Sequence, residues 1–464
     1  MSYFTKYVCF YELDKNNILM LNTLTSALDI IDHKTFSTIT RIIRKEFQIN
    51  DSDDLILYLK NRGYIFSESE EKEILNYFKK INSEMSLHSA CTGFKICPTM
   101  GCNLRCKYCY QSHSQHSNYE LMSDSKLDTI FRYIYNYKYN LLKNDMKDAK
   151  NIRIGLFGGE PLLIKSYKKV EKIFKFAKSI NSRVYITTNG LTVNKYSELL
   201  NEYKDNISMQ VTFDGAKSEH DKKRIYPNGD GTFDNVCIGV DEILKIGIKL
   251  NIRININRDN IYGLQNLKQT FDEHSWKSNK LLKVYATPIR SYEKELPFNV
   301  MRDSEILDIL MKKKLFGQKD SLIDALDSTV YDVTFRIFNS EQSGKKLWQV
   351  SYCEAAQGIQ YCFTPEGLIF TCLRCVDKKE YSIGNFDENY VNINYEKLNI
   401  WKKRNVFDIV KCKNCKFILL CAGGCPFYSL ERYGNINCAI CNDIDKTLQI
   451  YVCHIKNKLL KSGI

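Results

Sequence analysis

Cys102, Cys106 and Cys109 lie close together in the segment CNLRCKYC, with the spacing C-x3-C-x2-C. Three thiolates on one short loop can hold three irons of a 4Fe–4S cluster, which leaves the fourth iron open to another ligand. A structural zinc ion would need a fourth protein donor, which Cys97 or a distant cysteine could supply. Because the loop comes just before the first of several strand–helix units, we favour the iron–sulfur cluster.

A second set of cysteines occupies the C-terminal part of the chain, where residues 412–425 carry the spacing C-x2-C-x5-C-x3-C. A zinc ribbon would account for paired C-x2-C spacings but would leave the remaining cysteines unexplained. We therefore expect a metal-binding domain that is richer in ligands than a zinc ribbon. The other cysteines of this set are Cys353, Cys362, Cys372, Cys375, Cys438 and Cys441.

The composition is that of a globular protein, with 44% hydrophobic and 26% charged residues in 464, which excludes a disordered, collagenous or coiled-coil chain. The start, MSYFTK, lacks the features of a secretory signal, and no apolar run approaches the ~18 residues that cross a membrane. We therefore predict a cytoplasmic protein whose 18 cysteines stay reduced. The net charge of +13 suits either an acidic partner or a solvated lysine-rich surface.

The segment from about residue 94 to 290 alternates short apolar runs with amphipathic stretches, such as the predicted helices Ser125–Leu141 and Tyr167–Ile180. Repeated strand–helix units imply a parallel sheet, either open or closed as a full or partial barrel, and the five or six units that fit here fall short of the eight in a complete barrel. In such folds the chemistry lies at the C-terminal ends of the strands. The predicted strands are Ile152–Phe157, Val184–Thr188, Ile207–Phe213, Leu250–Ile256 and Leu282–Tyr285.

The first 66 residues are typical of a small winged-helix-like module. Apolar runs on both sides of residues 14–17 indicate a hairpin, and helical patterns follow at 26–31, 36–47 and 53–62 before a strand at 64–66. Residues 67–90 are polar and predict a helical linker. The predicted domains are 1–90 (module and linker), 91–290 (partial barrel), 291–345 (helical connecting region) and 346–464 (cysteine-rich domain).

The CNLRCKYC loop before a strand–helix series resembles the radical S-adenosylmethionine (SAM) superfamily. The resemblance implies an α/β fold with a partial (β/α)6 barrel and a 4Fe–4S cluster held by Cys102, Cys106 and Cys109. It also implies that the open iron chelates SAM, and that the reduced cluster cleaves SAM to a 5′-deoxyadenosyl radical that removes a substrate hydrogen. The chain is therefore expected to be an oxidoreductase of this type.

A glycine-rich segment, LFGGEP at residues 156–161, ends the predicted strand at 152–157. Gly158 and Gly159 would let the backbone approach a ligand closely, and Glu160 can accept hydrogen bonds from an ammonium group. The segment is similar to the family motif that binds the SAM amino group. This similarity assigns all three residues to the cofactor site.

Further cofactor residues follow from the same resemblance. It implies that Tyr108 belongs to the cofactor site, that Thr212 contacts SAM at a position usually occupied by serine, and that Arg224 binds the SAM carboxylate. Arginine suits a carboxylate because its donors are forked and permanently charged. The segment TTNG at 187–190 closes a strand as in the family, His220 is expected to be structural, and no general base is named.

The C-terminal spacing is similar to the SPASM domain, which usually carries two auxiliary 4Fe–4S clusters. The resemblance leaves the fourth site of the first cluster open between Cys362, Cys375 and a substrate ligand. For the second cluster it favours Cys441 as the last ligand, with Cys438 as the competing choice. The other implied ligands are Cys353, Cys372 and Cys425 for the first cluster, and Cys412, Cys415 and Cys421 for the second.

The N-terminal module resembles the recognition element of many peptide maturases, in which a leader peptide adds as a strand to a sheet edge. The segments CAGGCP (421–426) and YGNIN (433–437) are similar to maturases that build thioether bridges of the sactipeptide or ranthipeptide type. We therefore predict an enzyme of bacteriocin-like peptide maturation that joins Cys to an acceptor carbon. Its expected partners are a precursor peptide with a leader and an electron donor such as flavodoxin or ferredoxin.

Other functions fit parts of the same pattern. A carbon–carbon crosslinking maturase, or a sulfatase maturase that makes formylglycine, would use the same scaffold. A zinc protein that binds nucleic acid is a more remote alternative. The basic charge lacks the clustered arginines and interleaved aromatic residues of a nucleic-acid footprint, so we expect neither nucleic acid nor a membrane as partner.

Overall fold

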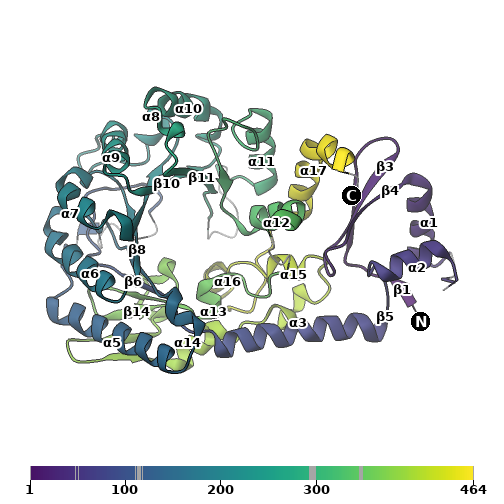
Figure 1. The fold of residues 1–464 in the computed structure, drawn as a ribbon, viewed down its shortest axis with the longest axis horizontal. Helices are drawn as coiled ribbons and strands as arrows, with labels where there is room; N and C mark the ends of the chain where they lie inside the picture. The colour runs from purple at the N-terminus through teal and green to yellow at the C-terminus, as the bar shows by residue number, and fades with distance from the viewer. Residues whose placement is uncertain are drawn as a thin grey trace.

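The computed structural model describes residues 2–46, 49–50, 52–109, 111, 116–117, 119–291, 299–343 and 348–462. Figure 1 shows a large barrel-like body and a smaller N-terminal module beside it, with the long helix α3 (Glu68–His88) running along one side between them. A capping box of Ser67 and Glu70 starts this helix. No helix among the described residues is long and apolar enough to cross a bilayer.

Six parallel strands form the core of the body, and they neighbour one another in chain order from β6 to β11. Helices cover their outer side (Figure 1), and β12 (Ala325–Leu326) adds a short parallel strand at the edge. This arrangement confirms the expected α/β partial barrel. The strands are β6 (Gly93–Ile96), β7 (Arg153–Leu156), β8 (Arg183–Thr188), β9 (Ile207–Phe213), β10 (Lys249–Ile256) and β11 (Leu282–Pro288). The outer helices are α5 (Asp124–Lys143), α6 (Tyr167–Ser179), α7 (Ser197–Glu202), α9 (Phe233–Ile246) and α10 (Leu264–Glu273).

The barrel strands alternate between two environments, as the period of two in a strand requires. In β9, Met209, Val211 and Phe213 belong to the main apolar core, whereas Gln210 and Thr212 line an interior cavity. The apolar side of each strand therefore holds the helices in place. The polar side leaves the interior of the barrel available to a ligand.

The cysteine-rich region continues the barrel sheet. β13 (Gln360–Phe363) pairs in parallel with β6, and three antiparallel strands follow, so that one sheet of eleven strands runs from β12 to β16. The added strands are β14 (Leu368–Phe370), β15 (Gly384–Phe386) and β16 (Val391–Ile393). The helices of this part of the chain are α11 (Asp303–Lys312), α12 (Thr329–Ser343), α13 (Glu354–Gln357), α14 (Tyr395–Lys402), α15 (Ile418–Cys421), α16 (Pro426–Tyr433) and α17 (Ile444–Ser462).

The N-terminal module is a three-stranded antiparallel sheet with two helices. The helix expected at residues 26–31 is wrong, because this segment forms β4 (Leu28–Asp32) along one edge of β3. Its β-branched Ile30 and Ile31 suit a strand, and pairing with the apolar β3 overrides the weak helical pattern. The other elements are β1 (Ser2–Phe4), β2 (Val8–Glu12), β3 (Asn17–Asn22), β5 (Ile65–Ser67), α1 (His33–Ile43) and α2 (Asp54–Asn61).

The module's sheet is covered on both faces. Leu19 and Leu21 of β3 belong to an apolar cluster with residues of α12, α15 and α17, whereas Met20 packs in a second cluster with residues of α1 and α2. The Tyr11 hydroxyl also donates to Asp445 over 2.9 Å. The module is therefore fixed against the C-terminal helices, and β4 remains an edge strand within the described residues.

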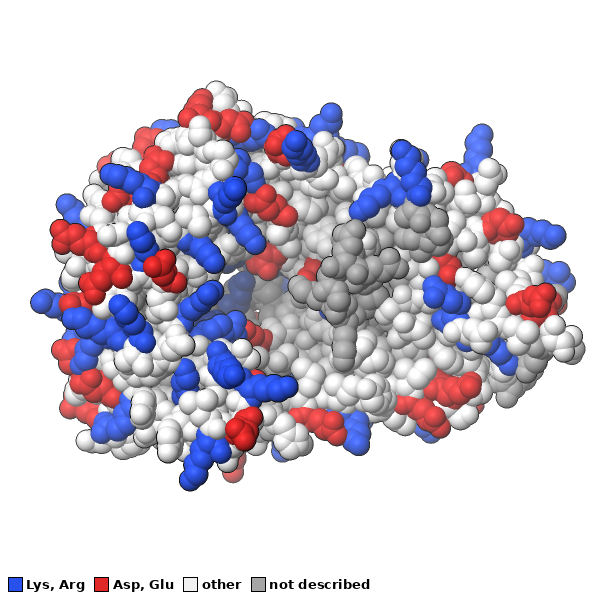
Figure 2. All heavy atoms as spheres, in the orientation of Figure 1, with Lys and Arg blue, Asp and Glu red and all other residues white. Residues whose placement is uncertain are grey.

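Charged side chains are mixed on the face shown in Figure 2. Lys and Arg alternate with Asp and Glu over the barrel, and a hollow opens between the barrel and the side that carries the N-terminal module. Mixed signs of this kind are typical of a solvated surface rather than of a nucleic-acid footprint.

Candidate active site

The C-terminal ends of the barrel strands meet at one cavity of about 350 Å³. Every cofactor or metal residue predicted in the first two-thirds of the chain lines it, although these residues come from four separate segments. A single chamber therefore joins the cysteine loop to the glycine motif and to the arginine. These residues are Cys102, Cys106, Tyr108, Cys109, Gly158, Gly159, Glu160, Thr212 and Arg224.

Backbone hydrogen bonds fix the cysteine loop to the segment that carries the arginine. The N–H groups of Arg105 and Lys107 donate to the carbonyls of Ile225 and Lys223 over 2.8 and 3.0 Å. Burial raises the pKa of the Cys102 thiol to about 12 and that of Cys109 to about 11. Since a coordinating thiol is deprotonated, a bound metal would favour the thiolate form that burial opposes here.

The glycine motif lies directly against the start of the cysteine loop. The Glu160 N–H donates to the Gly101 carbonyl over 2.9 Å, and a Cβ added at Gly159 would lie 2.2 Å from the same oxygen. Only glycine permits this approach, so Gly159 keeps the motif and the loop in contact.

Replacing Gly159 by alanine is expected to destabilise the protein by at least about 3 kcal/mol and to prevent SAM binding. The added Cβ would meet the backbone oxygens of Gly101 and Met100 at 2.2 and 2.3 Å, so the loop must move. Denaturant unfolding and titration calorimetry with SAM would measure the two effects. The matched control is Gly247→Ala, where the Cβ meets nothing within 4 Å and only the positive φ of 90° adds strain. Equal losses in both variants would contradict the steric explanation.

Glu160 is fully enclosed, and the TTNG segment holds it. Its carboxylate accepts from the Leu162 N–H over 2.9 Å, from the Thr188 hydroxyl over 2.7 Å and from the Asn189 N–H over 2.6 Å. Burial raises the pKa of this carboxyl, and these three donors oppose the rise. The carboxylate is thereby oriented beside the cavity, where it can receive an ammonium group.

Arg224 is buried in the cavity wall and fits a carboxylate ligand. Its Nη1 donates to the Tyr108 hydroxyl over 2.9 Å, but its Nε has no hydrogen-bond partner among the described residues. A buried guanidinium with an unused N–H is costly unless a ligand completes it. The residues present thus suit the amino-acid end of SAM, with Glu160 for the ammonium group and Arg224 for the carboxylate.

The motif-based prediction missed Asn255 of β10. Its amide donates to the Tyr108 hydroxyl over 3.2 Å and to Asp214 over 2.9 Å, and it lines the same cavity. The available signal was the register of the strand: in KLNIRINI polar and apolar residues alternate, so Asn255 is the polar position nearest the C-terminal end of β10. His220, by contrast, lies within 3.1 Å of the Thr232 hydroxyl, and burial lowers its pKa well below the usual value, which fits a structural side chain.

Four cysteines of the C-terminal domain lie near one another beside this cavity: Cys353, Cys372, Cys375 and Cys425. The neighbouring Cys375 thiol lowers the pKa of the Cys372 thiol. Cys362 instead contacts Cys97: the two sulfur atoms are 3.6 Å apart and both side chains are buried. Of the two cysteines considered for the fourth position, Cys375 is therefore the one beside the group.

A second group in the same domain contains Cys412, Cys415, Cys421 and Cys441. Burial raises the pKa of the Cys421 thiol to about 12, and its three neighbours add to the rise. Cys438 is bound through its backbone, since its N–H donates to the Ser429 hydroxyl and its carbonyl accepts from it. No three His, Cys, Asp or Glu side chains of the described residues close around one point as a single metal ion requires.

The first of these groups borders the cavity that holds the cysteine loop. Leu373 and Arg374, which lie between Cys372 and Cys375, are part of the cavity lining. The Arg374 guanidinium stands over the Tyr428 ring at 5.6 Å. The two cysteine-bearing regions, far apart in sequence, therefore face the same chamber.

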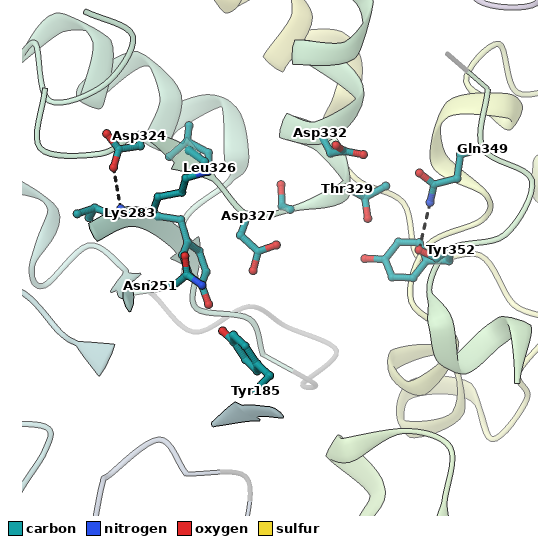
Figure 3. A pocket seen from close by; sticks show the side chains of 14 residues that line it. Tyr185, Asn251, Lys283, Asp324, Leu326, Asp327, Thr329, Asp332, Gln349 and Tyr352 are labelled. Atoms are coloured by element: carbon teal, nitrogen blue, oxygen red, sulfur yellow. Dashed lines mark hydrogen bonds between the residues drawn. The ribbon is translucent and has the colours of Figure 1, made fainter. Parts of the chain in front are cut away.

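A cleft of about 590 Å³ opens beside the chamber, between the β11–β12 edge and the start of α12 (Figure 3). Tyr185 and Asp327 point into it from the barrel, and Tyr352 faces them from the other side. The Gln210 side-chain oxygen accepts from the Tyr185 hydroxyl over 3.0 Å and from the Tyr285 hydroxyl over 2.5 Å. Gln210 lines the chamber, and both tyrosines line the cleft. These three side chains therefore separate the chamber from the cleft.

Comparisons with known proteins agree with this geometry. Residues 96–265 match the Radical SAM superfamily. The chain is 24% identical over 342 residues to the cysteine-type anaerobic sulfatase-maturating enzyme of Clostridium novyi. The aligned residues cover 70% of this chain and 84% of that protein.

Two solved structures share the fold. One is anSMEcpe with bound AdoMet and the Cp18Cys peptide, at 19% identity and a TM-score of 0.57, covering 80% of this chain and 98% of that one. The other is Streptococcus suis SuiB bound to S-adenosylmethionine, at 14% identity and a TM-score of 0.50, covering 96% and 100%. The matched family implies a 4Fe–4S cluster and SAM. Residues 96–265 thus form a radical SAM domain, and the chain is similar over most of its length to enzymes such as the sulfatase-maturating enzyme.

Proposed function

We propose that this enzyme modifies a ribosomally made peptide in the cytoplasm by joining a cysteine sulfur to an acceptor carbon. The observation that carries the proposal is the position of Leu373 and Arg374, which bring the Cys372 group to the wall of the SAM chamber. A substrate in the chamber would lie between the two cysteine-bearing regions. That position suits a reaction in which the substrate both loses a hydrogen atom and releases an electron.

When bound, the cluster and SAM supply a 5′-deoxyadenosyl radical that abstracts hydrogen. The chain's own residues bind and orient these groups. Cys102, Cys106 and Cys109 would hold three irons, Glu160 and Arg224 would receive the charged ends of SAM, and the other assigned residues would close the chamber. The other chamber residues that we assign to the cofactor site are Tyr108, Gly158, Gly159 and Thr212.

The electron balance of the proposed reaction gives the C-terminal cysteines a role. Forming a C–S bond from a C–H and an S–H removes one hydrogen atom, one proton and one electron, so an acceptor must stand nearby. We assign Cys353, Cys372, Cys375 and Cys425 to a first auxiliary 4Fe–4S cluster. The second is assigned to Cys412, Cys415, Cys421 and Cys441.

The N-terminal module supports a peptide substrate. Within the described residues β2 and β4 are the edge strands of a sheet whose two faces are covered, so an extended leader peptide would add along one of these edges. The anSMEcpe structure, whose fold is similar, holds the Cp18Cys peptide. A flavodoxin or ferredoxin would supply the electron that starts each cycle.

Co-expression with short cysteine-rich peptides encoded beside the gene is expected to give a product that has lost two hydrogen atoms and one alkylatable thiol per crosslink. Mass spectrometry before and after iodoacetamide treatment measures both. A product that loses hydrogen and keeps every thiol would indicate a carbon–carbon bond. Formylglycine in a sulfatase peptide would indicate the sulfatase activity, and either outcome would overturn the thioether proposal.

A further inference from the structure

His116 makes two contacts with the cysteine loop that neither the family motifs nor the proposed ligands include. Its backbone carbonyl accepts from the Cys102 N–H over 3.1 Å. Its ring nitrogen Nε2 lies 3.2 Å from the Cys109 sulfur. The side chain is 2% exposed, so the ring is held in place. One residue therefore connects the first and the third cysteine of the loop.

We propose that His116 donates a hydrogen bond from Nε2–H to the Cys109 thiolate and so tunes the reduction potential of the cluster on this loop. A thiolate bound to iron carries no proton and can only accept, so the ring must be the donor. This places the ring hydrogen on Nε2. His116 is thus a positioning residue, because it acts on the cluster through a ligand.

The effect on the potential follows from charge. Reduction adds one negative charge to the cluster and its thiolates, and hydrogen bonds to the sulfurs stabilise that charge. Removing the donor is therefore expected to make the cluster harder to reduce. A charge-assisted hydrogen bond of ordinary strength corresponds to about a tenfold change in the ratio of reduced to oxidised cluster at a fixed applied potential.

Among the described residues, backbone groups also act on these sulfurs. The Leu104 N–H donates to the Cys102 sulfur over 3.4 Å, and the Gln111 N–H donates to Cys109. Such donors are present whatever the side chain is. The His116 donor, by contrast, belongs to a side chain. A single substitution at this position can therefore change the reduction potential of the cluster.

The test compares His116→Leu with His116→Gln in the full-length, anaerobically reconstituted protein. Potentiometric titration would follow the EPR signal that changes on addition of SAM, because only the cluster with an open iron responds to SAM. We expect the leucine variant to be reduced about tenfold less at a fixed potential, and glutamine, which keeps a donor, to restore part of the loss. His274→Leu is the control, since this ring contacts Asp241 at 3.0 Å and does not line the chamber. An unchanged potential in His116→Leu with full iron would overturn the proposal.

A second measurement needs no substitution. It tests the hydrogen bond from His116 to Cys109 even if the leucine variant loses its cluster. Protein labelled with 15N-histidine is expected to show a weak 15N coupling to the reduced SAM-responsive cluster in pulsed EPR. No coupling would refute the hydrogen bond. A strong coupling would mean that the imidazole binds iron directly, which would also refute it.

Discussion

Cys102→Ala is expected to abolish formation of 5′-deoxyadenosine and to lower the iron content from about twelve to about eight atoms per chain. The cysteine loop offers three thiols to the chamber, and removing one leaves two protein ligands for a cluster that already has an open iron. The Cys102 side chain is 8% exposed, so water cannot readily replace its sulfur. Both losses are therefore expected together, and anaerobic iron analysis and chromatography of the SAM products would measure them.

The control for this substitution is Cys237→Ala, which removes another buried cysteine, in α9, that has no assigned role. Its iron content and SAM cleavage are expected to match those of the unaltered enzyme. If Cys102→Ala kept full iron and still cleaved SAM, the loop would not be the site of the SAM cluster. If both variants lost iron equally, the effect would come from general loss of packing.

The barrel could be predicted from the sequence because each strand carries its own local signal. The observed bounds of β9 are those expected, Ile207–Phe213, since polar and apolar residues alternate along ISMQVTF. The residues that the resemblance assigns to the cofactor also line one cavity. Each follows or lies near the C-terminal end of a parallel strand, and parallel strands bring these ends together at one edge.

Contacts between distant segments were not predictable in the same way. β4 resembles a helix in isolation and becomes a strand because β3 offers it an edge. Spacing alone also left Cys362 and Cys375 equivalent, whereas the pairing of β13 with β6 brings Cys362 close to Cys97 instead. His116 lies outside every motif, and only the folded loop brings it to Cys109.

Substitutions at Cys438 and Cys441 are expected to differ strongly in their effect on the iron content. Cys441→Ala is expected to remove about four irons per chain, whereas Cys438→Ala should keep all of them. The physical reason is position: Cys441 lies with Cys412 and Cys421, and the Lys411 ammonium interacts electrostatically with its sulfur. A thiolate next to this ammonium group is stabilised, as a cluster ligand requires.

The two variants are matched controls for each other, because both remove one thiol from the same short loop. The backbone of Cys438 is held by Ser429, which contacts both its N–H and its carbonyl. Alanine at this position therefore tests the effect of a substitution in the loop without removing a cluster ligand. Iron and sulfide analysis, with EPR of the reduced protein, would count the clusters. The reverse result, iron lost from Cys438→Ala and kept in Cys441→Ala, would contradict the assignment. Because the SAM chamber is lined by neither cysteine, SAM cleavage without peptide should survive in both variants, which separates loss of the second auxiliary cluster from loss of the catalytic one.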